Sequence, residues 1–275
     1  MKTGFPFTTL KVLSGLCKML FLGLLFFNAN PMMGQSESGK LASGAIIESF
    51  AQDYLQDRHF TQDWTFGVQV DKDEWTVKAI AKTAESPASI KVLEGFPEQA
   101  TFYFKTTELA LQDVANGKMN ALTGAVKAFS TDYAPFDLEV MEGYQPQENF
   151  VGQVLPLMFH FWTKGTPEII PFGAQHTRAT HGAQASIFYY QPGMRSGWGI
   201  LYPGQHANEH PSSKSNPFPS LMIITKGLVT AHLDGKVQEI EAGNAIFIPP
   251  GMQHEFFNKQ ETPVEFILLM FGDGA

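Results

Sequence analysis

The spacing of hydrophobic residues changes along the chain, and the change predicts two regions of different structure. Residues 40–142 have a mixed pattern, which opens with an apolar stripe at the three-to-four spacing of an amphipathic helix: Ile46, Ile47, Phe50 and Tyr54. In residues 183–275, short apolar runs are separated by glycine and proline turns. The sequence therefore predicts a two-domain chain, with an α+β domain followed by an all-β domain.

Within the first domain the pattern predicts both strands and a helix. WTFGVQV (64–70) and EWTVKAIA (74–81) alternate apolar and polar positions on either side of a short polar turn, which predicts a β-hairpin. ATFYFK (100–105) predicts a further strand. TTELALQDVANGK then predicts a helix that begins near Thr106 and ends at Gly117.

Residues 143–182 contain four prolines and predict a connector with one apolar stretch, VLPLMFHFW. We expect His160 in this stretch to be hydrogen-bonded, and His59, in the polar turn DRHFTQD, to be solvated. His176 and His181 either fold over the mouth of the all-β domain or lie in an exposed loop.

The second domain contains eight predicted strands and one specific motif. The strands lie in ASIFYYQPG, WGILYPG, LMIITKG, LVTAHLDG, QEIEAGN, AIFIPPG, HEFFNK and VEFILLMF. The motif is GNAIFIPPGMQHEFFN, which runs from Gly243 to Asn258 in the pattern G-x5-P-x-G-x2-H-x3-N. Gly243 permits a tight turn, and Pro249 and Gly251 end and reverse the strand AIFI, so we expect a positive φ at Gly251.

This motif resembles the second signature motif of the cupin family. The resemblance implies a cupin double-stranded β-helix, or jelly-roll barrel, over residues 183–275. It also implies that His254 points into the barrel, where the family's histidine is usually a metal ligand. The first cupin motif, G-x5-H-x-H followed by glutamate and glycine, is matched only in part. Gly204 and His210 fit, but serines, Ser212 and Ser220, occupy the second histidine position and the glutamate position.

Two alternatives follow for a metal in the barrel. In the first, the chain bends so that His206, Glu209 and His210 join His254 around a divalent zinc, iron, manganese or nickel ion. The bend is required because residues four apart on a regular strand are about 13 Å apart. In the second, His254 is a hydrogen-bonded residue inside a barrel without metal, and the other two histidines are solvated.

The first domain resembles the sterol carrier protein type 2 (SCP2-like) family over residues 40–142. The resemblance rests on ATFYFKTTELALQDVANGKMNALTGAVKAFSTD, in which a strand leads to a helix closed by an asparagine-glycine-lysine turn, a short helix and a final pair of strands. It implies a sheet with helices over one face and an apolar tunnel for a lipid-like ligand. The residues expected to line the tunnel are Phe102, Phe104, Leu109 and Phe129; the alternative is that they belong to the filled core of a small α+β domain.

Residues 1–34 have the composition of an export signal peptide. Lys2, Lys11 and Lys18 supply positive charge, and the nine residues MLFLGLLFF supply an apolar core. This core is short for a membrane-spanning helix, which needs about 20 residues. We therefore expect an exported protein, periplasmic or secreted, without stable membrane insertion after the signal is removed. The alternative is a protein anchored to the membrane by the uncleaved segment.

Charge and cysteine content narrow the choice of partners. The net charge is −8, and removal of residues 1–34 takes it to −11, because three lysines and no acidic residues are lost. An acidic chain of this kind does not favour nucleic acid as a partner. The single cysteine, Cys17, lies in the signal segment, so the remaining chain has no thiolate ligand or disulfide.

Three functions are compatible with these patterns. The first is a binding protein whose barrel holds a small ligand or metal and whose SCP2-like domain holds an apolar, lipid-like molecule. The second is a metal-dependent cupin enzyme of the oxygenase or isomerase type, with His254 as a ligand. The third is a non-catalytic interaction module that forms a homodimer through the barrel. The fold alone does not decide among them, because function depends on the site.

Overall fold

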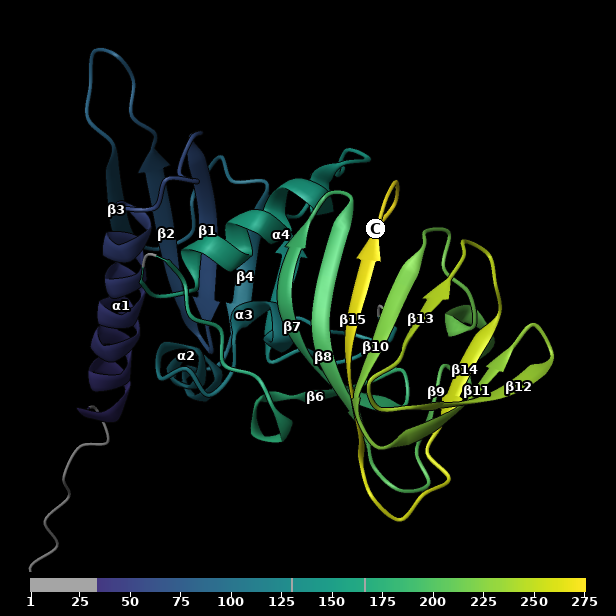
Figure 1. Cartoon of the computed structure of the whole chain (residues 1–275). Coiled ribbons are helices and arrows are strands. Elements are labelled where there is room, and N and C mark those ends of the chain that lie inside the picture. Colours follow the sequence, from purple (N-terminus) through teal and green to yellow (C-terminus); the bar gives the residue numbers. More distant parts are fainter. Residues whose placement is uncertain (1–33, 130, 166) are drawn as a thin grey trace, which may run out of the picture.

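The computed structural model describes residues 34–129, 131–165 and 167–275, so the predicted signal segment, apart from its last residue, lies outside the described residues. In the described part, the chain forms a five-stranded sheet with helices, followed by two further sheets that curve around a common interior (Figure 1). No helix in this part is long and apolar enough to cross a bilayer.

The five-stranded sheet has the order β3-β2-β1-β4-β5. β1 and β4 are parallel, whereas the other neighbouring pairs are antiparallel. Four helices accompany this sheet in the described residues. The bounds are α1 (Gly34–Tyr54), β1 (Trp64–Val70), β2 (Asp73–Ile80), β3 (Ser89–Glu94), β4 (Phe102–Thr106), α2 (Glu108–Ala115), α3 (Ala121–Gly124), β5 (Phe136–Val140) and α4 (Phe150–Phe161).

The predicted hairpin and helix are both present in this region. β1 and β2 form the hairpin, and α2 is the helix expected to begin near Thr106. Thr107 caps α2, because its side-chain oxygen accepts a hydrogen bond from the N–H of Ala110 at 3.2 Å. Helices and strands are thus both present in this region, as the pattern predicted, while the α+β domain of the SCP2-like family stays a prediction.

The predicted connector contains a helix that completes the core of the first domain. Most of VLPLMFHFW lies in α4, although Pro156 is inside the helix. The rings of Phe161 and Phe66 lie 5.1 Å apart, and Trp162, directly after α4, has its ring 4.9 Å from that of Phe136. Burial of one aromatic side chain contributes roughly 1.5–3 kcal/mol. The apolar stretch is thus part of the domain, and not only a link between domains.

The second domain contains two sheets, and all eight predicted strands are present. In the described residues the larger sheet has the order β13-β10-β15-β8-β7-β6 and the smaller has the order β12-β11-β14-β9. The bounds are η1 (Ala174–His176), β6 (Arg178–Thr180), β7 (Ala183–Gln191), β8 (Met194–Leu201), β9 (His206–Ala207), η2 (Pro211–Ser213), β10 (Ser220–Lys226), β11 (Leu228–Leu233), β12 (Lys236–Glu241), β13 (Ala245–Ile248), β14 (His254–Phe257) and β15 (Val264–Phe271).

The fixed residues of the Gly243–Asn258 motif have the structural roles that their chemistry allows. Gly243 has φ +89° and Gly251 has φ +78°, which confirms the predicted left-handed turns. Asn258 is fully buried, and its amide nitrogen donates to the carbonyl oxygens of Leu201 at 2.8 Å and Thr262 at 2.9 Å. This asparagine therefore ties three segments of the barrel together.

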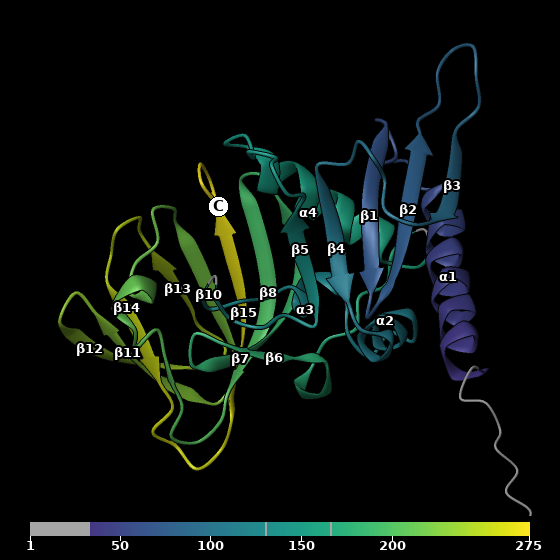
Figure 2. The same cartoon turned by 180° about the vertical axis from the view of Figure 1, so that it is seen from behind.

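The two domains share a tightly bonded interface at the edge of the barrel. Figure 2 shows α3 and β5 next to the barrel and β3 at the far end of the first sheet. β6 pairs only with residues 183–185 of β7, which leaves later residues of β7 on an open edge. There the N–H of Ile187 donates to Thr123 Oγ1 at 2.8 Å, and the Ile187 carbonyl accepts from Asn120 Nδ2 at 2.8 Å. The side chains of Thr123 and Asn120 thus form hydrogen bonds with backbone groups of Ile187 that would otherwise be unpaired on an open strand edge.

Candidate functional site

A cavity of about 480 Å³ lies inside the barrel and extends to the first domain. Its barrel walls are mostly apolar and include Met222, Ile248, Phe256, Phe266, Leu268 and Met270. Leu122 and Ala125, from α3 and its end, and Leu155 of α4 also line it. The cavity is therefore formed jointly by the two domains.

His254, the first residue of β14, is a buried polar residue in this cavity, with 3% of its surface exposed. Its Nδ1 lies 2.9 Å from the carbonyl oxygen of Met252. A carbonyl oxygen only accepts hydrogen bonds, so Nδ1 carries the proton and Nε2 of the neutral ring keeps its lone pair. Burial lowers the pKa of His254, although the Met252 carbonyl opposes this shift. His254 therefore offers the cavity a hydrogen-bond acceptor.

Arg195 and Ser220 supply a second polar group on the cavity wall. Met270 of β15 pairs with Arg195 of β8 on one side and with Ser220 of β10 on the other, so the three side chains share a face. Arg195 Nη2 donates to the carbonyl oxygen of Gly274 at 3.1 Å. Within the described residues, Arg195 Nε and Ser220 Oγ are buried and have no hydrogen-bond partner. Two donors are thus left unsatisfied in one row.

The charge of the cavity wall differs from that of the whole chain. Lys127, His181, Arg195 and His254 line the cavity, and no aspartate or glutamate from the described residues does so. Lys127 is paired with Asp137, whereas Arg195 has no acidic partner in the described part. Burial lowers the pKa of His181, which lies in the turn before β7. His181 thus lines the cavity and is also exposed in its turn, so the two placements considered for it do not exclude each other.

The comparison with protein families identifies the barrel. The family model described as a cupin domain matches residues 198–270, which include the Gly243–Asn258 motif and about half of the residues that line the cavity. Residues 198–270 form a cupin domain. The family prediction for this part of the chain is confirmed.

Solved structures of cupins resemble part of the chain at low identity. A cupin 2 conserved barrel domain protein from Salinispora arenicola is 20% identical, with 38% of this chain and 88% of that chain covered and a TM-score of 0.34. An RmlC-like cupin from Shewanella frigidimarina is 16% identical, with 39% and 94% covered and a TM-score of 0.33. A predicted oxalate decarboxylase from Thermotoga maritima is 21% identical, with 32% and 79% covered and a TM-score of 0.29. The sequence matches none of the curated proteins with which it was compared.

The cupin barrel does not assemble the predicted metal ligands. Glu209 and His210 are exposed, and His210 accepts a hydrogen bond from the N–H of Ser212 as the cap of η2. His206 pairs with Phe257, one residue further along the alternating strand than the inward-facing Phe256. Its Nε2 lies 3.0 Å from Glu255 Oε2, without hydrogen-bond geometry. The chain does bend after β9, but Glu209 and His210 are exposed beyond the bend and do not line the cavity that holds His254.

A metal centre of the kind that the family implies therefore does not fit this cavity. A zinc site in a protein needs three or four donor side chains. In the described residues, His254 belongs to no group of three such side chains, and the two motif positions beside it are held by Ser212 and Ser220. The structure therefore does not bring the four predicted ligands together: His254 lines the cavity, whereas His206, Glu209 and His210 do not.

The four residues expected to line an apolar tunnel do not meet in one cavity. Phe102 and Phe104 are 2% and 0% exposed, and the centroids of their rings lie 5.3–5.7 Å from each other and from that of Phe66. Leu109 is 68% exposed and Phe129 is 39% exposed, with the Phe129 ring 4.7 Å from that of His210. Apolar spacing in the sequence could not separate a filled core from a tunnel. Here two of the residues are core and two are surface.

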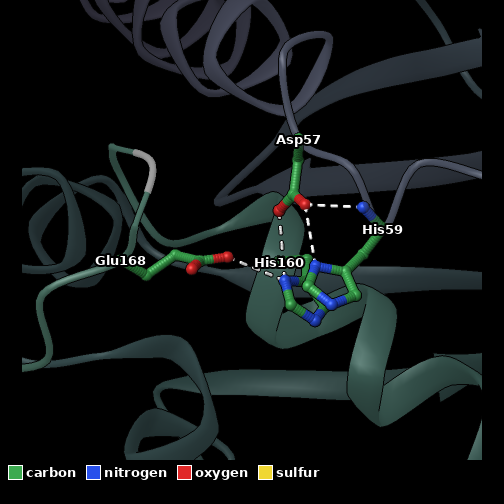
Figure 3. A group of neighbouring side chains, drawn as sticks. All are labelled: Asp57, His59, His160 and Glu168. Atoms are coloured by element: carbon green, nitrogen blue, oxygen red, sulfur yellow. Dashed lines mark hydrogen bonds and ion pairs between the residues drawn. The ribbon is translucent and has the colours of Figure 1, made fainter.

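A second polar cluster lies in the first domain, away from the barrel cavity (Figure 3). Asp57 Oδ1 is 2.9 Å from His59 Nδ1 and accepts the N–H of His59 at 2.7 Å. Asp57 Oδ2 is 3.1 Å from His160 Nδ1, and Glu168 Oε1 is 2.8 Å from the same nitrogen. The two imidazole rings stack with their centroids 4.0 Å apart. Two carboxylates thus converge on one imidazole nitrogen.

The sequence analysis missed this cluster. The expectations that His160 is hydrogen-bonded and that His59 is exposed to solvent both agree with the structure, but they did not connect the two residues. Asp57 and His160 are 103 positions apart, and no spacing motif links them. Burial would raise the pKa of the Asp57 carboxyl, but the N–H of His59 and the imidazole of His160 hold it below its usual value. Asp57 is therefore present as a carboxylate.

Proposed function

We propose that this protein binds a small organic acid with an apolar body in the cavity of its cupin domain. The observation that carries this proposal is the row in which Arg195 Nε and Ser220 Oγ, both buried, lack partners in the described residues. Buried polar groups are normally hydrogen-bonded, so such donors are candidates for contact with a ligand.

The charge of the wall favours an anionic group over a neutral one. A carboxylate only accepts hydrogen bonds, and it pairs with a guanidinium through short, charge-assisted bonds. Arg195 and Ser220 are separated by one strand, which places their backbones about 10 Å apart. A carboxylate bound between these two donors would accept from both. It would also supply the acidic partner that Arg195 lacks.

The rest of the cavity favours a ligand body that is mostly apolar and that also carries a polar group. Side chains such as Met222, Phe256 and Phe266 form most of the wall near His254. A volume of about 480 Å³ is within the range of pockets that hold small organic ligands. His254 Nε2 would accept a hydrogen bond from a hydroxyl or N–H of the ligand. The proposed role of His254 is thus recognition and not metal coordination.

In this proposal the first domain is a wall of the binding site. Leu122 and Leu155 reach the cavity from α3 and α4, so a barrel without these helices would lose one side of its pocket. A separate tunnel for a lipid-like ligand, as the SCP2-like resemblance implies, finds no support in the filled aromatic core. The proposed setting remains an exported protein, on the strength of residues 1–34 alone.

The test is a panel of carboxylic acids with aliphatic or aromatic bodies, each matched to its amide and its alcohol. A bound ligand raises the Tm in proportion to the logarithm of its concentration. Acids are expected to raise the Tm and the matched neutral compounds to raise it less. Calorimetry should then give an affinity that falls at least about 30-fold in Arg195→Met, because removal of one partner of a buried charged pair costs at least about 2 kcal/mol.

Two further variants make the result specific. Arg195→Lys keeps the charge but loses the planar fork, so it should retain part of the affinity. Lys236→Met removes an exposed positive charge on β12 and should leave binding unchanged. Equal binding of acids and matched amides, or an unchanged affinity in folded Arg195→Met, would contradict the proposal.

A further inference from the structure

The cluster of Asp57, His59, His160 and Glu168 joins two parts of the chain that are distant in the sequence, since Asp57 and His160 are 103 positions apart (Figure 3). Asp57 and His59 lie in the turn after α1, His160 lies in the last turn of α4, and Glu168 lies in the segment after α4. The cluster therefore lies in the first domain, where the C-terminal ends of α1 and α4 come together.

The composition of the cluster is that of a cation site. Each of its four side chains offers one oxygen or nitrogen ligand atom, and these atoms lie within 4.8 Å of one another. In a tetrahedral zinc site with bonds of about 2.0–2.1 Å, ligand atoms are roughly 3.4 Å apart. The observed separations, which include 2.8, 2.9 and 3.1 Å, are already close to this spacing.

The carboxylates of Asp57 and Glu168 have fewer hydrogen-bond donors around them than their oxygens can accept from. His160 Nδ1 has one proton at most, yet it faces both Asp57 Oδ2 and Glu168 Oε1. Across the described residues, no lysine or arginine forms an ion pair with either carboxylate. Their side chains are only 6% and 16% exposed, so solvent compensates little of this charge.

Two helix ends add to the negative potential at the cluster. The C-terminal end of a helix carries partial negative charge, and α1 and α4 both end next to these side chains. Asp57 Oδ1 already accepts the backbone N–H of His59, which fixes the orientation of this carboxylate. The Asp57 carboxylate is thus oriented by the backbone, and within the described residues no lysine or arginine balances the charge of the two acidic side chains.

We propose that Asp57, His59, His160 and Glu168 bind one divalent transition-metal ion, with zinc the preferred ion. Mixed imidazole and carboxylate donors suit zinc, and four protein ligands make a closed, structural type of site. The ion would connect the ends of α1 and α4 to the segment that holds Glu168. Phe159, beside His160, packs its ring 4.8 Å from that of Tyr189 on β7, so the ion would also brace α4 where it meets the barrel.

The first experiment measures metal in the full chain, purified without chelators, by mass spectrometry of the elements. About one equivalent of zinc per chain is expected. Dialysis against EDTA should remove it and lower the Tm, and added zinc should restore the Tm, because an ion that binds only the folded state stabilises it. Cobalt(II) in place of zinc should give the visible spectrum of a tetrahedral site.

Variants then locate the ion. Asp57→Asn and Glu168→Gln keep the shape of each side chain and remove the charge, and each should weaken zinc binding at least tenfold, since even outer partners of metal ligands contribute about 10–100-fold. Asp53→Asn, one turn earlier on α1, removes the same charge outside the cluster and should bind zinc normally. Glu168 lies outside the helices and strands, so Glu168→Gln is decisive if Asp57→Asn fails to fold.

Two results would overturn the proposal. One is less than about a tenth of an equivalent of zinc, iron or manganese after reconstitution of folded chain, which would leave the cluster as a hydrogen-bonded clasp without an ion. The other is undiminished zinc binding by folded Glu168→Gln, which would place the ion elsewhere. Neither result depends on whether the barrel binds an organic acid, because the four residues do not line that cavity.

Discussion

Arg195 and Ser220 lie in one cross-strand row on the inner face of the barrel, with Met270 between them. Ser220 occupies the position at which the first cupin motif has a glutamate. A glutamate there would place a carboxylate in the same row as Arg195 and could serve as its counter-ion. A serine instead leaves Arg195 without an acidic partner in the described residues. It also adds a buried hydroxyl that has no hydrogen-bond partner there. The departure from the motif thus removes a metal-ligand position and, in our proposal, creates an anion-binding one.

Replacement of Ser220 by alanine should have opposite effects on stability and on binding. The free protein should be as stable as the wild type or up to about 1 kcal/mol more stable, because a buried hydroxyl without a partner is removed. Affinity for the acids should fall about fivefold, the equivalent of one hydrogen bond of about 1 kcal/mol. Urea unfolding and calorimetry measure the two effects separately.

The control for this prediction is Thr230→Val. Thr230 Oγ1 is also buried without a partner in the described residues, but Thr230 does not line the cavity. This variant should match Ser220→Ala in stability and the wild type in acid affinity. An equal loss of affinity in both variants would show that the Ser220 effect is indirect.

Acid should destabilise the protein partly through His254. Its folded pKa lies below the ordinary value of 6.5 because the ring is buried. The unfolded chain therefore binds more protons than the folded chain between the folded pKa and about pH 6.5. The contribution of His254 to the free energy of unfolding is thus complete above about pH 6.5, and it is lost as the pH falls through this window. His254→Asn should reduce the slope of unfolding free energy against pH in this range.

The burial of His181 lowers its pKa as well, so some of the slope should remain in His254→Asn. The double variant with His181→Asn should be flatter than either single variant. A slope that is unchanged in the double variant would contradict the assignment. Equilibrium unfolding in urea at several pH values measures these slopes directly.

Local sequence signals were sufficient for the strands and turns of the barrel. Glycines at residues 243 and 251 require left-handed backbone geometry, and the apolar runs between such turns have the length of strands. The same signals failed for α4, because an apolar run that contains Pro156 and is followed by further prolines is typical of a connector. Its burial against Phe66 and Phe136 is a tertiary effect that spacing along the chain does not encode.

The candidate sites were harder to predict because their residues come from distant segments. His254 was placed in the barrel through its motif, but whether His206 and His210 would join it depended on the direction of the chain after β9. The positive φ of Asn208, +62°, turns the chain there, and asparagine tolerates this geometry without marking it in the sequence. Similarly, nothing near His59 indicated that His160 would stack on it.

Gly251→Val should destabilise the barrel through the backbone alone. The φ of +78° disfavours valine, while a Cβ at this position would meet no atom within 4 Å. The expected cost is about 1–3 kcal/mol, and Gly251→Asn should cost less, since asparagine adopts positive φ more readily. Urea unfolding of both variants tests the order. Equal stability of the wild type and Gly251→Val would show that this turn can relax without cost.

Arg178 should contribute strongly to the attachment of the two domains. From β6 its guanidinium donates to three carbonyl oxygens of the first domain: Gly124 at 2.8 Å, Val126 at 2.7 Å and Tyr133 at 2.8 Å. Arg178→Met should lower the free energy of unfolding by about 3 kcal/mol, because each hydrogen bond to a charged group contributes about 1.5–3 kcal/mol and part of the loss is recovered by water. Arg178→Lys should recover less than half of this lost free energy, since one ammonium group does not reproduce the planar guanidinium.

Arg58→Met, at an exposed site, is the control for this prediction, and its free energy of unfolding should match that of the wild type within about 0.5 kcal/mol. Limited proteolysis between residues 124 and 133 should accelerate in Arg178→Met; full protection of this segment would show that the other interface bonds suffice.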